Sequence, residues 1–415
     1  MSKFNFQRYN KVLDDLSCES FYILNRNLFN QEYFNLLNAF KQKYSQTNIA
    51  YSFKTNYVSD LVNEVRKNNG YAEVVSSMEL ELALRTGFDE KSIFFNGPFK
   101  HQNIRESFLS KGGIVNIDSY SEFISIKNFA ESKNIKVRIG IRLNFGSEDF
   151  KSRFGVDVNS GEIDEILKLS KKSLFISIAS IHCHYAPRNI DKWEFCTRNM
   201  ISFLKSKYIK YFDSLDYISL GGGMYSDMSA ELKSQIKFKI PSFEEYAMMS
   251  SNIINDFFLN EKPFINSPEL LVEPGTALAS KSLDFLVKVV SIKKINESFI
   301  VNTTGSKYNV NPSIYRLNSP YDIFNKKNHS NTELKNALIA GYTCIESDII
   351  HNEFSGFLSQ DDLIVFKEVG SYSLVMKPQF ILPNIPIIEF LANGEYKIIK
   401  RAETFDDVFS AYMSL

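Results

Sequence analysis

Short apolar runs alternate with helix-like segments along the first two thirds of the chain. Between the runs, segments such as Val58–Asn68, Met78–Thr86 and Tyr120–Ser132 have the apolar spacing of amphipathic helices. The strand-like runs are 49–54, 72–76, 93–97, 114–118, 136–143, 177–184, 216–220 and 269–273. Alternating strands and helices are typical of a parallel sheet, and eight such units predict a (β/α)8 barrel of the TIM type. A doubly wound open sheet is the structural alternative.

The pattern changes after about residue 280, and a chain of 415 residues is long enough for two domains. The later runs are strand-like, at 285–292, 298–302, 337–341, 362–368 and 396–401. They predict a separate β-rich domain, an antiparallel barrel or sandwich. The run Phe21–Leu24 is also strand-like. We therefore expect residues 1–30 to add N-terminal strand(s) to the β domain, 31–278 to form the barrel, and 279–415 to form the C-terminal β domain.

Composition excludes several classes of function. The 48 basic and 48 acidic residues are dispersed, without the basic stripe of a nucleic-acid-binding protein or the polybasic cluster that binds membranes. The sequence contains no signal-like apolar segment near its start and no apolar run of about eighteen residues. The cysteines lack paired spacing, which is typical of a reducing cytosol. We expect a cytoplasmic protein that acts on a small molecule.

Chemically active side chains follow the predicted barrel strands, at the end where barrel enzymes place their active sites. The first strand ends in Lys54. Burial depresses the pKa of a lysine, and a partly neutral amine can form a Schiff base with an aldehyde. A surface lysine is the simpler interpretation of this residue taken alone. The residues at the other strand ends favour a chemical role for Lys54.

Three further strand ends carry polar or flexible residues. Gly221, Gly222 and Gly223 could let backbone N–H groups surround an anion, although a tight turn explains them equally well. Glu273 follows an apolar run, so it needs a partner such as a protonated pyridine nitrogen or an arginine. His182 and His184 alternate on a strand and could bind metal, stack on a ring or simply pack. Metal-dependent hydrolysis needs more ligands at this position than the sequence offers, so we predict no metal.

An aldehyde-binding lysine, an anion-binding loop, a buried carboxylate and a ring-stacking histidine together describe a pyridoxal phosphate site. The sequence resembles fold-type III pyridoxal phosphate decarboxylases, the ornithine and diaminopimelate decarboxylase group, over roughly residues 20–385. The matching segments, in the family's order, are Tyr51–Asn56, Glu73–Glu79, Asn116–Ser119, Arg142–Asn144, Ser152–Gly155, His182–His184, Gly221–Gly223, Glu273–Gly275, Gly341–Cys344 with Asp348, and Gly370–Tyr372. The resemblance implies a barrel of the alanine racemase type.

The resemblance also implies a role for each matching residue. Lys54 would bind the cofactor covalently, His184 would stack on its ring, and Glu273 would keep the pyridine nitrogen protonated. The phosphate would bind to the three glycines and to Tyr372. Cys344 would come from the partner subunit of a homodimer with shared active sites and would protonate the carbanion after carbon dioxide leaves. A thiol suits that role because it is a weak acid.

Four departures from the family pattern concern the substrate. Glu-Pro-Gly is usually followed by arginine, which here is Thr276. The family's His-x-Gly-Ser becomes His184-Tyr185-Ala186-Pro187, followed by Arg188, which could restore the lost charge. Asn311 replaces an arginine before Pro312-Ser313-Ile314-Tyr315, and Ile345 takes the place of an acid that moves to Glu346. The candidate substrate residues are Arg188, Tyr315, Glu346 and Asp348.

These changes remove positive charge from the place where a distal carboxylate would bind, so meso-diaminopimelate is a poor candidate. We expect decarboxylation of a different amino acid or an amino-acid conjugate. An amino-acid racemase of the same barrel family is one alternative. A catalytically silent relative that only binds the cofactor or a partner is another.

Overall fold

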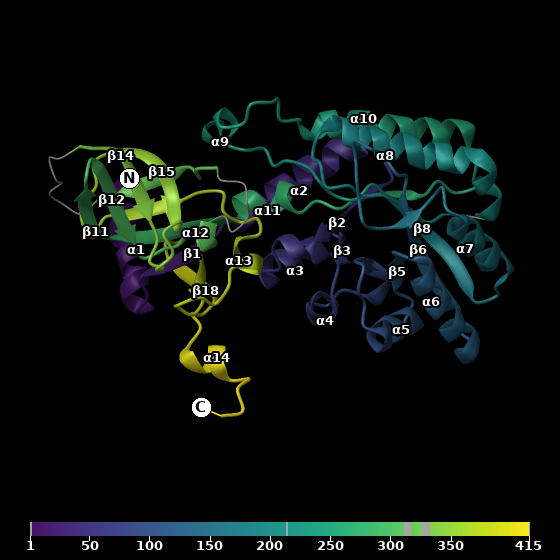
Figure 1. The fold of residues 1–415 in the computed structure, drawn as a ribbon, viewed down its shortest axis with the longest axis horizontal. Helices are drawn as coiled ribbons and strands as arrows, with labels where there is room; N and C mark the ends of the chain where they lie inside the picture. Colours follow the sequence, from purple (N-terminus) through teal and green to yellow (C-terminus); the bar gives the residue numbers. More distant parts are fainter. Residues whose placement is uncertain (1, 213–214, 311–316, 326–332, 415) are drawn as a thin grey trace. The chain divides into compact units, whose positions relative to one another are not determined.

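The computed structural model describes residues 2–212, 215–310, 317–325 and 333–414 (Figure 1). The chain divides into two compact units. One contains residues 30–227 and 240–277, and the other contains residues 1–29, 228–239 and 278–415. The short segment 228–239 belongs to the second unit because Ser229 and Gln235 bond to Glu368 and Asn318 of that unit.

Among the described residues, eight parallel strands close into a barrel in the first unit. The strands are β2 Thr47–Ser52, β3 Tyr71–Val74, β4 Ile93–Phe95, β5 Ile114–Ile117, β6 Val137–Asn144, β8 Ile176–His182, β9 Tyr217–Ser219 and β10 Glu269–Val272. A short strand β7, Val156–Asp157, pairs with β6. Because β5 pairs with β6 and β10 pairs with β2, the sheet has no free edge among these eight strands. The predicted barrel is confirmed, and the open sheet is excluded.

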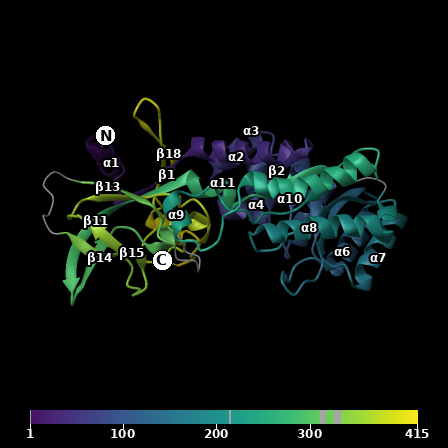
Figure 2. The ribbon, with the colours of Figure 1, turned by 90° about the horizontal axis from the view of Figure 1, so that it is seen from above.

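Helices connect the barrel strands and lie around them (Figures 1 and 2). They are α2 Arg26–Lys41, α3 Ser59–Lys67, α4 Ser77–Arg85, α5 Gln102–Ser110, α6 Tyr120–Lys133, α7 Gly161–Lys172, α8 Ile190–Phe203 and α10 Phe243–Asn255. Several begin at a side chain that accepts a hydrogen bond from the first turn, as Ser76, Ser119 and Asn189 do. Inside the barrel, Phe94 and Leu271 pack with Ala50, Ile114 and Ala179.

The second unit is built on a mixed β-sheet. Its strands are β1 Ser20–Leu24, β11 Leu283–Ile295, β12 Ser298–Thr303, β13 Tyr321–Phe324, β14 Leu334–Ala340, β15 Ile349–Gly356, β16 Leu363–Phe366, β17 Ile387–Phe390 and β18 Tyr396–Lys400. Strand β1 pairs with β11, as the Phe21–Leu24 run predicted. The predicted β-rich domain is confirmed, and most of its strand pairs are antiparallel, but the sheet is mixed because β1 pairs with β17 and β12 with β14 in parallel. Both parallel pairs join strands separated by long connections, which parallel pairing requires.

Helices in this unit are α9 Ala230–Ser234, α12 Lys307–Val310, α13 Ser373–Met376, α14 Phe405–Phe409 and α1 Ser2–Asp15, and α11 Thr276–Ala279 crosses the boundary between the units. The sequence pattern did not predict helix α1. Residues Tyr9, Val12 and Leu13 of α1 pack against Phe21 and Leu286 of the sheet.

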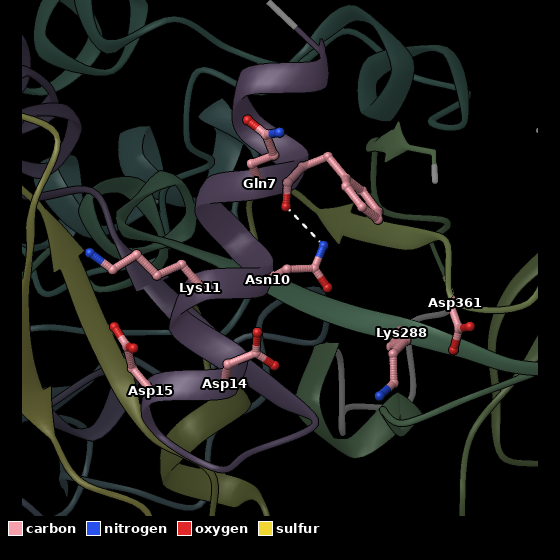
Figure 3. Close-up of a pocket in the computed structure, with 8 residues that line it drawn as sticks. Gln7, Asn10, Lys11, Asp14, Asp15, Lys288 and Asp361 are labelled. Carbon is pink, nitrogen blue, oxygen red and sulfur yellow. Dashed lines mark hydrogen bonds between the residues drawn. The ribbon is translucent and has the colours of Figure 1, made fainter. Parts of the chain in front are cut away.

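A groove beside the polar side of α1 is lined by Phe6, Gln7, Asn10, Lys11, Asp14, Asp15, Lys288 and Asp361 (Figure 3). None of the predicted site residues lies in this groove.

Candidate active site

Lys54 lies just beyond β2, in a short 3-10 turn formed by Phe53–Thr55. Its Nζ atom is 2.8 Å from Ser52 Oγ and 2.5 Å from Glu73 Oε2. The Ser52 hydroxyl also donates to the same Glu73 oxygen. Glu73 is 1% exposed, whereas the Lys54 side chain is 37% exposed. A reactive amine is thus held against a buried carboxylate but stays accessible. The Glu73 contact was not anticipated from sequence, although the residue lies at the end of the second predicted strand.

Glu273 directly follows β10 and is buried. Its carboxylate accepts a hydrogen bond from Ser219 Oγ at 2.7 Å and lies 3.2 Å from His182 Nε2. Burial alone would raise the pKa of Glu273, but the charge and hydrogen bond of His182 and the hydroxyl of Ser219 lower it below its ordinary value. The carboxylate is therefore ionised at neutral pH. It can hold a proton on a ring nitrogen bound beside it.

His184 lies two residues beyond the end of β8, against the glycine loop. A Cβ atom on Gly221 would be 2.5 Å from His184 Cβ, so only glycine permits this contact. Burial, followed by the charge of Lys192, lowers the pKa of His184 well below its ordinary value. Its Nδ1 atom is buried with no hydrogen-bond partner in the described structure. A neutral, flat ring of this kind is suited to stacking.

The histidines do not belong to a metal centre in the described part of the chain. No group of three or more His, Cys, Asp or Glu side chains is arranged there to hold a metal ion. His182 instead bonds to Glu273, so the two histidines have different environments. The metal alternative has no geometric support in the residues that the structure describes.

Residues 221–223 form a tight loop after β9. Gly221 and Gly223 have φ angles of +65° and +81°, which side chains rarely adopt. A Cβ atom on Gly222 would lie 2.2 Å from the Glu273 carbonyl oxygen. The carbonyls of Gly222 and Gly223 accept hydrogen bonds from Lys192 Nζ at 2.7 Å and from the indole of Trp193 at 3.2 Å. Helix α8 therefore anchors the loop, and neither of its two side chains was singled out from the sequence.

Arg188 approaches the segment that follows β10. Its Nη2 atom donates to Thr276 Oγ1 at 3.2 Å. Its backbone carbonyl accepts a hydrogen bond from the Tyr246 hydroxyl, and its guanidinium lies 5.4 Å from the centre of the Tyr225 ring. These contacts fix Arg188 beside the residue that stands where the family pattern has arginine.

The remaining predicted site residues belong to the β-rich unit. Cys344 and Glu346 are exposed, and Tyr372 has a φ angle of +60° at the start of α13. Tyr315 lies outside the described residues. Asp348 is buried and accepts hydrogen bonds within its own unit, from Ser306 Oγ, Lys307 N, Thr343 N and Thr343 Oγ1. Because these donors already occupy its carboxylate, we assign Asp348 to shaping the loop and not to the substrate.

The barrel residues fit pyridoxal phosphate. An accessible amine, an ionised carboxylate and a neutral histidine ring occupy neighbouring strand ends. Beside them a glycine loop leaves no room for side chains. These groups can respectively bind an aldehyde, a pyridinium nitrogen, a ring face and a phosphate.

Residues 32–280 match the family model described as "Pyridoxal-dependent decarboxylase, pyridoxal binding domain". The chain belongs to this family. It is a fold-type III decarboxylase that uses pyridoxal phosphate. The predicted family, cofactor and reaction type are confirmed, and the family members compared below are all decarboxylases.

Two curated relatives and one solved structure illustrate the similarity. A diaminopimelate decarboxylase of Methanocaldococcus jannaschii is 26% identical, covering 94% of this chain and 90% of that protein. The L-glutamyl-[BtrI acyl-carrier protein] decarboxylase of Niallia circulans is 25% identical, with 90% of both chains covered. A crystal structure of the M. jannaschii diaminopimelate decarboxylase with L-lysine has a TM-score of 0.83 at 22% identity, covering 98% of this chain and 94% of that one. It supports the fold.

In the part of the chain that the structure describes, every helix is too short or too polar to cross a membrane.

Proposed function

We propose that this protein decarboxylates an amino acid or amino-acid conjugate other than meso-diaminopimelate, releasing carbon dioxide and an amine. We further propose that the active species is a homodimer in which each site draws residues from both subunits. The observation that carries the substrate proposal is the contact between Arg188 and Thr276. Because of this contact, a guanidinium lies beside position 276, where the family pattern has arginine, but it belongs to residue 188.

Each side chain of the barrel site has a defined task in this proposal. Bound pyridoxal phosphate supplies an electron sink for the electron pair of the broken carbon–carbon bond. Lys54 would bind the cofactor through its amine, and Ser52 and Glu73 orient that amine by accepting hydrogen bonds from it. Glu273 holds a proton on the pyridine nitrogen, and the neutral His184 ring covers one face of the cofactor.

Protonation of the product carbon is assigned to Cys344 of the second subunit. The thiol is exposed in the described chain, which leaves it available to complete a site. Tyr372 of that subunit would bind the phosphate together with Gly221, Gly222 and Gly223. Glu346, also exposed, is assigned to an amine on the substrate.

The altered placement of fixed charge, with one arginine moved to position 188 and none at position 311, supports a substrate without the distal carboxylate of meso-diaminopimelate. Thr276 and Asn311 stand where the family pattern has arginines, and Ile345 stands where it has an acid. The Niallia relative acts, by its name, on a glutamyl group carried by a protein. An amino acid joined to a carrier through its side chain would have no free distal carboxylate. We therefore include amide and thioester conjugates among the candidate substrates.

A substrate screen tests this proposal. The purified protein, loaded with pyridoxal phosphate, would be incubated with free L- and D-amino acids and with amide, ester and thioester conjugates. Carbon dioxide release and amine formation would be measured together, and stereoinversion would be followed in parallel. We expect turnover of a substrate other than meso-diaminopimelate. Turnover of meso-diaminopimelate at ordinary enzyme rates would contradict the substrate proposal, and stereoinversion without carbon dioxide release would point to a racemase.

A further inference from the structure

Lys192 is a fully buried lysine in the first turn of α8. Its Nζ atom donates to the Gly222 carbonyl at 2.7 Å and lies 4.3 Å from the centre of the Trp193 ring. In the described part of the chain no carboxylate lies within ion-pair distance of this amine. A buried ammonium is costly unless an opposite charge offsets its lost hydration. Among the described residues, this buried lysine therefore has no carboxylate partner.

A second buried lysine in the same unit provides a comparison. Lys100 Nζ also donates to a glycine carbonyl, Gly97 O, at 2.6 Å. In addition, it bonds to both oxygens of Glu122, at 3.0 and 3.1 Å. Lys100 therefore has the anion that Lys192 lacks. Both lysines are buried, but only Lys100 has a carboxylate partner among the described residues, which leaves the charge of Lys192 available to an anionic ligand.

The position of Lys192 indicates what that ligand is. A Cβ atom on Gly223 would lie 3.2 Å from Lys192 Nζ, so the amine lies directly against the glycine loop. Lys192 and Trp193 hold the carbonyls of two successive loop residues toward α8. In a trans peptide the N–H points away from the C=O, so the N–H groups of Gly223 and Met224 point away from α8. The loop presents amide donors on the side opposite to the buried charge.

The electrostatic environment agrees with this arrangement. Burial lowers the pKa of Lys192 to about 8, against opposing effects of Cys196, Cys183 and Glu273. Lys192 is also the strongest nearby charge among those that lower the pKa of His184. The field of this amine therefore reaches the group that covers the cofactor ring.

We infer that Lys192 supplies the buried positive charge of the phosphate subsite and fixes the glycine loop that binds the cofactor phosphate. The family pattern has a serine after His-x-Gly and an arginine after Glu-Pro-Gly, and this chain has Pro187 and Thr276 there. Lys192 contributes positive charge from the α8 side of the glycine loop. This role concerns the cofactor and does not depend on which amino acid is decarboxylated.

A comparison of two ligands tests the inference. Pyridoxal phosphate and pyridoxal share the aldehyde and the ring, and only the first carries a phosphate. Trp193 is the only tryptophan in the sequence and bonds to the loop, so its fluorescence reports binding to the apo-protein independently of activity. Titrations of wild type and Lys192→Met with each ligand would give four dissociation constants, with visible absorbance as a second readout.

Lys192→Met should raise the Kd for pyridoxal phosphate by about 10- to 100-fold, the range for loss of a contact to a charged group. The Kd for pyridoxal should change by less than about threefold, because it lacks the phosphate. Equal weakening of both ligands would overturn the inference and leave a purely structural role. An unchanged Kd for pyridoxal phosphate would overturn it as well.

Lys100→Met is the matched control, because it removes another buried lysine bonded to a glycine carbonyl. It should lower the melting temperature, since Glu122 loses one of its two cationic partners in the described structure and keeps only Arg105, but leave the ratio of the two dissociation constants unchanged. A similar ratio change in this control would contradict the assignment to Lys192. If Lys192→Met does not fold, Lys192→Gln keeps a polar group against the loop and is read by the same criteria. If wild-type protein binds both ligands and Lys192→Met shows the expected change in the Kd ratio, but wild type decarboxylates no substrate in the screen, the proposed function fails and this inference stands.

Discussion

The guanidinium of Arg188 lies 3.2 Å from the hydroxyl of Thr276, although 88 positions separate the two residues in the chain. Arg188 precedes α8, and Thr276 is the first residue of α11, which follows β10. Thr276 stands where the family pattern has arginine. The charge missing from one strand end is therefore present beside it, on a side chain that starts from another strand end.

This contact predicts that an arginine at position 276 can partly replace Arg188. Arg188→Gln should raise KM for the true substrate and lower kcat/KM by about 10- to 100-fold, the range of a charged hydrogen bond. Adding Thr276→Arg to Arg188→Gln should recover part of that loss. Steady-state kinetics of the single and double variants measure both effects.

Thr276→Ala is the control for that experiment, since it removes only the hydroxyl that positions Arg188. It should cost less than about tenfold in kcat/KM. If Arg188→Gln has wild-type kinetics, Arg188 does not contact the substrate or the cofactor.

Substitution of Glu273 should lower the rate of the chemical step more than it lowers the affinity for the cofactor. Glu273→Gln removes the negative charge that holds the ring proton and should lower kcat by about 10²- to 10³-fold, a typical loss for one charge-stabilising group. Ser219→Ala removes a single hydrogen bond to Glu273, so the expected loss is only about tenfold or less. Single-turnover rates on protein saturated with cofactor separate the two. A Glu273→Gln variant with an unchanged rate would exclude this role.

Two carboxylates close together in sequence should behave differently. Asp348→Asn places an NH2 group among four donors, so the free energy of unfolding should fall by about 2–4 kcal/mol. Glu346 is exposed, so Glu346→Gln should leave stability unchanged. Its expected effect is a higher KM and a loss of about 1.5–3 kcal/mol in kcat/KM. Urea denaturation and steady-state kinetics on both variants provide the comparison, and the reverse assignment of effects would refute it.

The shared-site proposal predicts recovery of activity between two inactive variants. Lys54→Ala and Cys344→Ala chains should each be inactive alone. After subunit exchange, random pairing makes half of the dimers mixed, and each mixed dimer has one intact site out of two. Activity should therefore reach about a quarter of wild type. Confirmed exchange without recovery would place both residues in a site built from one subunit.

Local patterns were sufficient to predict the barrel strands and the β-rich unit. The helix α1 was missed, although Tyr9, Val12 and Leu13 have helical spacing, because the polar residues around them obscured the apolar stripe. The parallel β1–β17 pair could not be predicted, since pairing between distant strands depends on how the chain returns to the sheet.

The site was predicted less completely than the fold. Lys54, His184 and Glu273 follow strands, so their position was visible in the sequence. Lys192 shares the buried face of α8 with Cys196 and Met200 at spacings of four, a signal that was present but unused. The hydrogen bonds that Asp348 accepts within its own unit could not be inferred, because a motif does not show which way a carboxylate faces.

The covalent attachment of the cofactor to Lys54 is the central claim and can be measured directly. Purified protein supplied with pyridoxal phosphate should absorb visible light, and borohydride should reduce and fix the cofactor on a single lysine. Peptide mapping by mass spectrometry should place the label on the peptide containing Phe53, Lys54 and Thr55, and Lys54→Ala should carry no label. Colourless protein after cofactor addition, or a label on a different lysine, would contradict the account.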